Sequence, residues 1–550
     1  MARVVRAAID PLIQLGLTPS QARGELSFTV PEDILPTLKQ FQNRHQYVRT
    51  TQMLENSKPS IMREILLSKR FVADMSDTQY FTFGYDIIGE SPQFGIGGPD
   101  DPFTVGVTTK TLLRQMNRDP ASFVFHWDAT YKINSKEFPV LVCGITDIAR
   151  QFHPVAFFII SRETVVEYSW AMRELMAIYE HVVGGQLKLR YIMSDAAKAP
   201  ALAIQTLYND LGVETTLMCF YHCVANVHKK VKGLPLPTKK AVFSHIYQLH
   251  YSRSCAEMDF HWNNIQEKWS TYPELVALEF ISYFSDQWIE SPASCWQIFH
   301  TPQGFATTNN PCETFNKILK AIYTKRTKHG VCANVALLGD IAVEYSTIKA
   351  ATFSLTAMPS AKLVQRTKRL ISSALLQAVS TSEVEGMALP DGEILVRSIV
   401  PQNALRMSFA HQYRLLGSTR AEAQAATDAG LMSAQDEADV RAYYCNANSN
   451  NIRHEMMCSG HNQPWYGWRV RTNTGDLYCE CNYYFKNAYC CHLIFALKQQ
   501  NKDFHGYPLP PSTFHSAARR RLTRSYGPVT HRNRRLGRSR TAVASALTIQ

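Results

Sequence analysis

The sequence predicts an α/β protein built around a mixed β-sheet, with helical regions before, within and after the sheet. From residue 121, apolar runs of strand length alternate with turn-prone residues, and helix-length amphipathic segments then follow. The composition is that of a folded protein, since 45% of the 550 residues are hydrophobic and 19% are charged. A chain of this length is expected to form several domains.

The order of elements in this region predicts a particular kind of sheet. Three strands are expected first, in SFVFHWDAT, FPVLVCGIT and HPVAFFIIS. A helix from Val165 to His181, a strand in LRYIMSD, a helix from Ala201 to Leu211 and a strand in TTLMCFY follow. Three antiparallel strands followed by alternating helices and strands predict a ribonuclease-H-like mixed sheet.

The rest of the chain divides around this core. We expect a helical N-terminal region (1–75), a Gly- and Pro-rich connecting region (76–115), the core (116–223 and 306–350), an all-helical insertion bearing several Trp (224–305), a helical and mixed linker (351–440), a small cysteine-containing module (441–505) and a basic disordered tail (506–550). Within these, a helix from about Pro311 to Tyr323 should begin after the turn TTNN with Asn310 as its cap. A strand is expected near Glu393 to Val400, and an Ala-rich helix from Arg420 to Ala426.

The formal net charge of +12 suggests a polyanionic partner, and most of it lies in the tail. Residues 519–540 hold nine arginines and no acid: Arg519, Arg520, Arg521, Arg524, Arg532, Arg534, Arg535, Arg538 and Arg540. The tail is either a solvated, solubilising end, or a nuclear address or non-specific phosphate contact. No apolar stretch approaches the roughly 20 residues of a membrane span, so no membrane partner is expected. Asp10 and Pro11 interrupt the apolar N-terminus, so secretion is not indicated.

Two carboxylates follow predicted strands, and a third opens a predicted helix. Asp128 ends the strand SFVFHW and Asp195 ends LRYIM, and sites in open α/β sheets form at such carboxyl ends. Glu313 lies on the first turn of the helix after TTNN, where the helix dipole favours a negative charge. Acidic oxygen ligands are what Mg²⁺ requires, and two such ions can serve phosphodiester chemistry. An Asp at a strand end is also a common turn residue, and Glu at a helix start is favoured anyway.

The blocks HWDATYK, MSDAAKA, CFYHCVANVHKK and TTNNPCETFNKILK occur in this order over roughly residues 120–325. Together they resemble the transposases of Mutator-like elements (MULEs), which are cut-and-paste enzymes of the DDE type. The resemblance implies a catalytic triad of Asp128, Asp195 and Glu313 that binds Mg²⁺ (or Mn²⁺), and it implies a helical insertion before Glu313. The family's C-x-x-H element falls on Cys219 and His222, which either pack at the strand end, our preferred interpretation, or shape the DNA path.

A second cluster lies near the C-terminus, where Cys479-x-Cys481 precedes Cys490-x-His492. Three thiolates and an imidazole suit a structural, four-coordinate Zn²⁺ site. Four unrelated core thiols are the alternative, and Cys491 is a competing ligand beside Cys490. The spacing resembles the SWIM-type zinc finger, a C-x-C…C-x-H module often found behind MULE transposase domains, and the resemblance selects Cys490.

The function expected from these features is that of a metal-dependent, nuclear DNA transposase that assembles as a homo-oligomer on element ends and target DNA. A domesticated transposase acting as a DNA-binding transcription regulator is the alternative. A stand-alone ribonuclease-H-type nuclease would account for the triad but not for the large insertion and the zinc module. No cysteine precedes Cys143, so an N-terminal zinc finger of the kind common in related transposases is not expected in residues 1–120. The sequence leaves open which region reads the terminal DNA.

Overall fold

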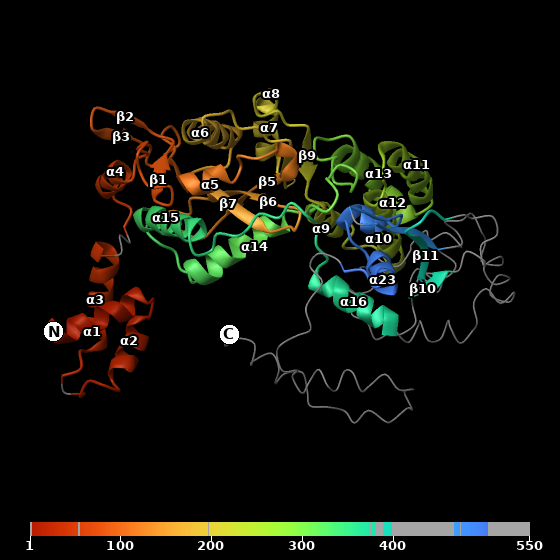
Figure 1. Ribbon diagram of the computed structural model, residues 1–550. Helices are drawn as coiled ribbons and strands as arrows, with labels where there is room; N and C mark the ends of the chain where they lie inside the picture. Colours follow the sequence, from red (N-terminus) through yellow and green to blue (C-terminus); the bar gives the residue numbers. More distant parts are fainter. Residues whose placement is uncertain are drawn as a thin grey trace. The chain divides into compact units, whose positions relative to one another are not determined.

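The fold is described by a computed structural model (Figure 1). It describes residues 3–32, 34–52, 56–195, 197–372, 376–379, 389–398, 467–473 and 475–503. The arginine-rich tail and the predicted helix from Arg420 to Ala426 lie outside these ranges.

A seven-stranded mixed sheet with the order β1-β4-β7-β6-β5-β8-β9 forms the centre of the protein. Its strands are β1 (Tyr80–Phe83), β4 (Thr104–Thr109), β5 (Val124–Thr130), β6 (Val140–Thr146), β7 (Phe152–Ile160), β8 (Tyr191–Ser194) and β9 (Thr215–Met218). The strands β5, β6 and β7 are antiparallel, β8 pairs parallel to β5, and β9 pairs parallel to β8. The predicted order of strands and helices is therefore observed, and β4 and β1 extend the sheet beyond β7.

The strand directions bring three carboxyl ends to one edge of the sheet. Because β7 is antiparallel to β6 and β6 is antiparallel to β5, β7 runs in the same direction as β5. The parallel strand β8 runs in this direction too. The residues that follow β5, β7 and β8 are therefore neighbours at that edge, where sites form in open α/β sheets.

Helices cover both faces of the sheet (Figure 1). On one face lie α6 (Val165–Val183) and α7 (Lys198–Thr206), with the short α8 (Tyr208–Leu211) after them. On the other lie α4 (Pro59–Ser68), α14 (Asn310–Ile318), its π-helical continuation η4 (Leu319–Tyr323) and α15 (Val331–Ser346). Every residue of β6 is buried, which explains why this strand is a continuous apolar run in the sequence.

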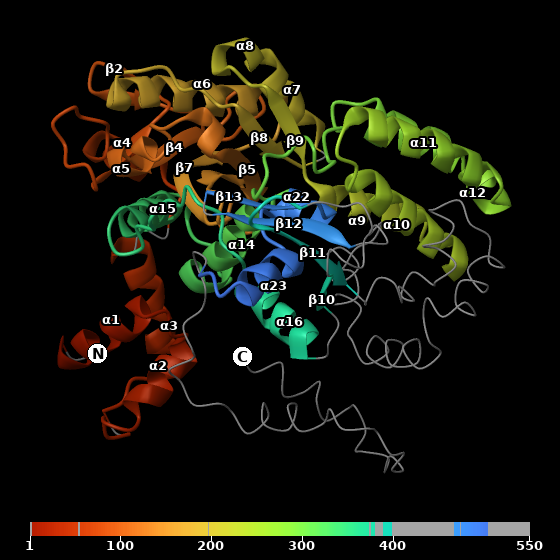
Figure 2. The same cartoon turned by 45° about the vertical axis from the view of Figure 1, so that its right-hand side comes forward.

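The segment between β9 and α14 is helical, as predicted. It contains α9 (Phe220–Lys230), α10 (Leu236–His250), α11 (Cys255–Ser270), α12 (Pro273–Ala277), α13 (Phe280–Phe284) and η3 (Ser285–Ile289). Figure 2 shows α10 and α11 side by side. The buried side chains of Trp262, Trp269, Trp288 and Trp296 form much of its separate core. Helix α9 begins at Phe220, before the predicted boundary at residue 224, because Cys219 is its N-cap.

The N-terminal region is also helical as predicted. It comprises α1 (Arg3–Gln14), α2 (Pro19–Leu26), α3 (Leu38–Tyr47) and η1 (Val48–Gln52), which share a small core around Phe41. Thr18 and Thr37 start α2 and α3 with capping boxes. Between α4 and β5 lie β2 (Asp86–Ile88), β3 (Ser91–Gln93), α5 (Lys110–Arg114) and η2 (Pro120–Ser122).

A second sheet, with the order β10-β11-β12-β13, carries the cysteine cluster. Its strands are β10 (Leu376–Val379), β11 (Glu393–Ser398), β12 (Trp468–Asn473) and β13 (Asp476–Cys479), and α16 (Ala361–Ser372), α22 (Asn482–Asn487) and α23 (Cys491–Gln499) accompany them. The predicted boundary at residue 441 divides this sheet, because β11 pairs directly with β12. The hairpin β12–β13 is therefore not a self-contained module, since β11 supplies a neighbouring strand with buried Leu395 and Val396.

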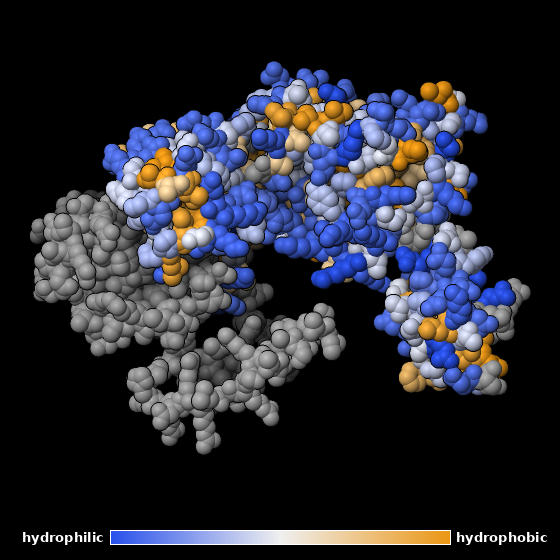
Figure 3. Space-filling view, turned by 180° about the vertical axis from the view of Figure 1, so that it is seen from behind, coloured by the Kyte–Doolittle hydropathy of each residue, from blue (hydrophilic) through white to orange (hydrophobic). Residues whose placement is uncertain are grey.

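The face shown in Figure 3 is mainly hydrophilic, with small separate hydrophobic patches. Within the described ranges, no helix combines the length and the apolar character that crossing a membrane requires.

Candidate functional site

Asp128 and Asp195 meet at the edge of the sheet. Asp128 lies near the end of β5 and Asp195 directly follows β8, and these two strands pair in parallel, with Phe125 opposite Ile192. Both aspartates line one cavity of about 250 Å³. The prediction that their strands are neighbours is confirmed.

Glu313 approaches the same place from helix α14, although it does not line that cavity. Three residues further along the helix, Asn316 Nδ2 donates a hydrogen bond to Asp128 Oδ2 at 2.7 Å. Residues three apart lie on the same face of a helix, so Glu313 and Asn316 both face β5. This bond fixes the helix that carries the third acid against the strand that carries the first.

A second bond holds the start of α14 to β5. His126 Nδ1 donates to Asn309 Oδ1 at 2.8 Å, and His126 Nε2 shares a hydrogen bond with the Thr146 hydroxyl at 2.8 Å. Complete burial lowers the pKa of His126 to about 4, although the hydrogen bond to Asn309 opposes this effect. The N-cap of α14 is Asn309, so the prediction that Asn310 caps the helix was wrong by one residue. The Asn309 side chain does not cap the helix, because it bonds to His126.

The three acids interact electrostatically. Burial, and then the charges of Asp195 and Glu313, raise the pKa of Asp128, while the hydrogen bond from Asn316 and the charge of Lys320 lower it; the net result is a pKa of about 7. Among the described residues, the buried Oε1 of Glu313 has no hydrogen-bond partner. Carboxylates that repel one another and retain free oxygens are a suitable donor set for Mg²⁺ or Mn²⁺.

A fourth carboxylate, which the sequence analysis missed, lines the same cavity. Glu163 follows β7 and accepts hydrogen bonds from the hydroxyl of Tyr131 on both carboxylate oxygens, at 2.6 Å each, and from that of Tyr168 at 3.3 Å. Burial is the main cause that raises the pKa of both tyrosines, and Glu163 raises both further through its hydrogen bonds and its charge. An acid just after a strand was the signal used for Asp128, and it applies equally to Glu163.

Cys219 and His222 lie beside Glu313, and their environments differ. The completely buried Cys219 Sγ accepts a hydrogen bond from the backbone N–H of Asn309 at 3.2 Å, so it holds the turn before α14. His222 is 31% exposed, and its Nε2 lies 4.0 Å from Glu313 Oε1. The preferred interpretation, packing at the strand end, suits Cys219, whereas His222 faces the third acid.

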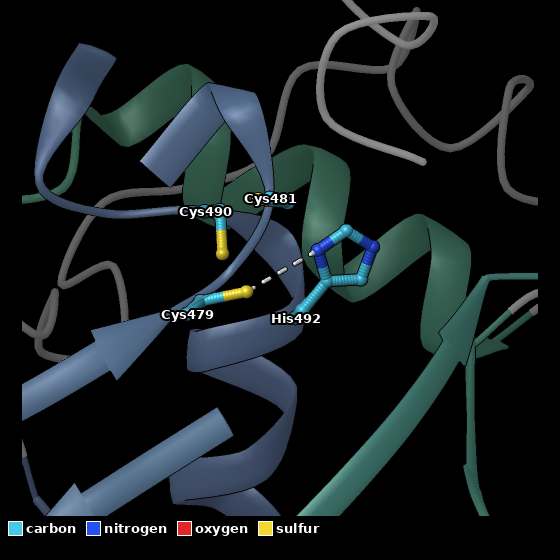
Figure 4. A group of neighbouring side chains, drawn as sticks. All are labelled: Cys479, Cys481, Cys490 and His492. Carbon is cyan, nitrogen blue, oxygen red and sulfur yellow. Dashed lines mark hydrogen bonds between the residues drawn. The ribbon is translucent and has the colours of Figure 1, made fainter. Parts of the chain in front are cut away.

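The four C-terminal residues predicted to bind zinc form one buried cluster. Their ligand atoms all lie within 4.8 Å of one another, and Figure 4 shows Cys479 Sγ directed toward His492 Nδ1, at 3.9 Å. Cys479 ends β13, Cys481 is the N-cap of α22, and Cys490 is the N-cap of α23. The cluster contains Cys490 and not Cys491, as expected from the C-x-H spacing.

The surroundings of this cluster fit a metal ion. Cys481 Sγ accepts a hydrogen bond from the backbone N–H of Tyr484, and Cys490 Sγ accepts one from the backbone N–H of Leu493, both at 3.3 Å. Each of these sulfurs therefore lies at the N-terminus of a helix, a position that favours the thiolate form. Burial raises the pKa of the Cys479 and Cys490 thiols well above the usual value. All three thiols can therefore ionise together only when a cation compensates their charge, so this buried Cys₃His cluster could bind zinc.

The comparisons with known proteins agree with the geometry of the core. A search of curated proteins finds no match. The family model for the MULE transposase domain matches residues 124–226, from the start of β5 into α9. The matched segment contains Asp128, Asp195, Cys219 and His222 and ends before Glu313. Residues 124–226 are thus similar to the MULE transposase domain, a similarity that supports a transposase-family function and implies DNA binding.

Proposed function

We propose that the protein is a metal-dependent DNA transposase of the Mutator-like type, with a ribonuclease-H-like core and the triad Asp128, Asp195 and Glu313. The observation that carries the proposal is that acids from three distant segments interact at one edge of the sheet, two of them within the segment that matches the MULE domain. The strand order supports the fold assignment, since three antiparallel strands are followed by two parallel strands beside the first.

In this proposal the three carboxylates hold two divalent cations. Bound Mg²⁺ or Mn²⁺ would activate the attacking oxygen and stabilise the leaving oxygen of a phosphodiester. Asn316 orients the Asp128 carboxylate through its hydrogen bond. His126 keeps α14 in register by holding Asn309, so it positions Glu313 without contacting the substrate.

The chemistry consists of two displacements at phosphorus. In the first, a water oxygen attacks the phosphorus at the element end, the bond from phosphorus to the 3′-oxygen breaks, and that oxygen takes up a proton. In the second, the freed 3′-hydroxyl loses its proton as it attacks a phosphodiester of the target, whose own 3′-oxygen leaves with a proton. Neither step needs an oxidant or another reactant.

Cleavage of DNA that carries the element ends tests the proposal. Asp128→Asn, Asp195→Asn and Glu313→Gln should each remove nearly all strand cleavage and leave DNA binding largely intact, because each loses a metal ligand. The matched control is Asp259→Asn, which removes an exposed acid on the helical insertion and should cleave normally. Full activity in any of the three triad variants would overturn this assignment. If the unmodified protein binds DNA but does not cleave it, the alternative function, a domesticated transposase acting as a DNA-binding transcription regulator, would be favoured.

We also propose that the Cys₃His cluster belongs to a SWIM-type zinc finger with a structural role. With four protein ligands there would be no open position for a substrate, so the ion would stabilise the fold and would take no part in catalysis. The cluster joins β13 to α22 and α23, so zinc would connect the sheet to both helices.

The arginine-rich tail, residues 519–540, is proposed to contact DNA phosphates or to direct the protein to the nucleus. Deleting the tail should weaken binding to matched and scrambled DNA alike, because interactions with phosphates carry no sequence information. Each phosphate that the protein no longer neutralises lowers the dependence of log K on log salt by about 0.9. An unchanged slope with loss of nuclear entry would leave targeting as its role. Assembly as a homo-oligomer on DNA is a further proposal, which light scattering of the protein–DNA complex would test.

A further inference from the structure

A strongly basic segment follows the third acid. Between Glu313 and Asp340 the chain has no Asp or Glu and five Lys or Arg residues: Lys317, Lys320, Lys325, Arg326 and Lys328. The run is inconspicuous in the sequence, because it is interrupted by the apolar residues that bury one side of α14 and η4. Its cations belong to the proposed catalytic core, in contrast to those of the tail.

This segment is joined to the loop between β5 and β6. The loop, residues 131–139, lies against residues 324–330, because Ser135 N–H donates to His329 O and His329 N–H donates to Ile133 O, both at 2.8 Å. A salt bridge between Lys328 and Glu137 adds a third connection. The two loops therefore form one surface, which contains Lys132 and Lys136 as well. We call this surface, residues 131–139 and 317–330, the basic rim.

The backbone of the basic rim is held in uncommon conformations. Positive φ angles occur at four of its non-glycine residues: Lys132 (64°), Glu137 (59°), Lys325 (48°) and Arg326 (58°). The buried Asn134 side chain fixes the first loop by donating to Phe138 O at 2.7 Å and accepting from Phe138 N–H at 2.9 Å. Such conformations are strained for residues other than glycine and persist where the surrounding structure imposes them, as at functional sites. The cations are thus presented by a preorganised surface.

Several cations of the rim are available for a ligand. Lys132, Lys136, Lys317 and Arg326 are exposed, and none has a side-chain hydrogen bond or salt bridge to a described residue. A cation on an ordinary solvated surface is usually near an acid, but the rim has a single acid, Glu137, and Lys328 neutralises it. The net charge of the surface remains strongly positive.

The rim is continuous with the acids of the site. Lys317 and Lys320 follow Glu313 by four and seven residues, a spacing that places them along the same side of α14 and its continuation. Lys320 is close enough to Asp128 for its charge to lower the pKa of that carboxyl. Burial is the main cause that lowers the pKa of Lys320; the charge of Asp128 raises it and the charge of Lys132 lowers it, so Lys320 lies near both residues. The positive surface therefore begins where the cluster of acids ends.

We propose that the basic rim binds the phosphate backbone of the duplex next to the phosphodiester to be cut, on the Asp128 and Glu313 side of the site. The placement beside the cut rests on the proposed function. The acids repel DNA, and cations directly beside them compensate this repulsion for the flanking phosphates. Lysines and arginines on loops contact phosphates without reading bases, so the rim sets the register of the strand and supplies no sequence specificity.

The test measures the salt dependence of binding by the full-length protein. The probe is a fluorescein-labelled 30-base-pair duplex of scrambled sequence, followed by fluorescence anisotropy at several NaCl concentrations. The variant Lys132→Asn/Lys317→Gln/Arg326→Asn removes three charges, with Asn at the two left-handed positions because it tolerates that conformation. We expect the slope of log K against log salt to decrease by about 2.7 and the affinity at low salt to fall on the order of tenfold.

A matched control removes the same charge elsewhere. Lys229→Gln/Lys232→Gln/Lys240→Gln neutralises three lysines of the helical insertion and should leave the slope nearly unchanged. The single variant Lys317→Gln, at an exposed helical position, should lower the slope by about 0.9 even if the triple variant proves unstable. An unchanged slope in both rim variants, or an equal loss in the control, would overturn the proposal.

The test of the basic rim and the test of the catalytic triad give independent answers. All binding measurements are repeated with Asp128→Asn in buffer without added Mg²⁺ or Mn²⁺ and without a chelator, so no cleavage is needed and the zinc site is left intact. If Asp128→Asn cleaves DNA normally, the triad is refuted, yet the slope still decides whether the rim binds phosphates. If the triad is correct and the slope does not change, the rim proposal alone fails.

Discussion

Asn316 Nδ2 donates a hydrogen bond to Asp128 Oδ2 at 2.7 Å, joining residues that are 188 positions apart in the chain. Asn316 lies one helical turn after Glu313, so the same helix that supplies the third acid also orients the first. The position of Glu313 relative to Asp128 is thus set by direct contact between the two elements. A small change at Asn316 should therefore affect both carboxylates.

Asn316→Ala should lower strand cleavage by about 10- to 100-fold, the usual loss when a residue that orients a metal ligand is removed. The Mg²⁺ concentration needed for half-maximal cleavage should rise, because Asp128 is no longer held in one orientation. Cleavage assays over a Mg²⁺ titration measure both effects. The control is Asn264→Ala, whose amide donates to Phe260 O within its own helix α11. An unchanged Mg²⁺ requirement in Asn316→Ala would show that the bond is merely structural.

Cys219 and His222 should respond differently to substitution although they belong to one motif. Cys219→Ala leaves the buried N–H of Asn309 without its acceptor, which should cost about 1–3 kcal/mol of the free energy of unfolding. His222→Gln changes a partly exposed side chain and should alter stability by at most about 0.5 kcal/mol. Its proximity to Glu313 predicts reduced cleavage at normal stability. Thermal unfolding measures the stability of both variants, and cleavage assays measure their activity. A stable Cys219→Ala protein with reduced cleavage, together with an unstable His222→Gln protein, would show that the two residues have the opposite roles.

The purified protein should contain one Zn²⁺ per chain, held by the Cys₃His cluster. Cys479→Ser and His492→Ala should lose the metal and the structure around it, because binding energy at such sites is folding energy. Cys491→Ser is the matched control, since Cys491 is buried beside the ligand Cys490 but is not part of the cluster. Metal analysis of each variant provides the measurement, and zinc-free protein with an intact fold would contradict the assignment.

The fragment needed for this fold should be longer than the spacing of the cysteines suggests. β11 pairs with β12 and buries Leu395 and Val396, so the segment 441–505 lacks a strand of its own sheet. We expect the fragment 376–503 to fold with zinc and the segment 441–505 to unfold at a lower temperature. Circular dichroism of the two fragments with and without a chelator tests this. Equal melting temperatures would show that β11 contributes nothing.

The sequence predicted those parts of the site that depend on local patterns. Cys479, Cys481, Cys490 and His492 were recognisable because their spacing along the chain determines which side chains converge on a hairpin and a helix start. Asp128 could be placed at a strand end because a buried strand is an uninterrupted apolar run.

Contacts between distant segments could not be predicted in this way. The bond from His126 to Asn309 depends on how α14 packs against β5, and no local periodicity encodes it. Glu163 was missed for a related reason. The predicted antiparallel order of the first three core strands already places the end of β7 at the edge where β5 ends, but the hydrogen bonds of Glu163 to Tyr131 and Tyr168 follow from no local pattern.

Lys486 of α22 gives the protein a pH dependence that can be measured. Its amino group donates a hydrogen bond to the buried His250 Nε2 at 3.0 Å, where helix α22 meets the helical insertion. Burial, and then the nearby charge of Arg150, lower the pKa of Lys486 to about 7, against about 10.4 in an unfolded chain.

The sign of the effect follows from proton counting. Between pH 7 and about 10.4 the folded protein binds fewer protons at Lys486 than the unfolded protein does, so stability should rise with pH across this window. The slope should not exceed about 1.4 kcal/mol per pH unit, the limit for one group. Lys486→Met should flatten this dependence, whereas Lys498→Met, which alters an exposed lysine of α23, should retain it. Melting temperatures of zinc-loaded protein at pH 7, 8 and 9 provide the measurement. Parallel curves for the unmodified protein and Lys486→Met would show that Lys486 stays charged in the fold.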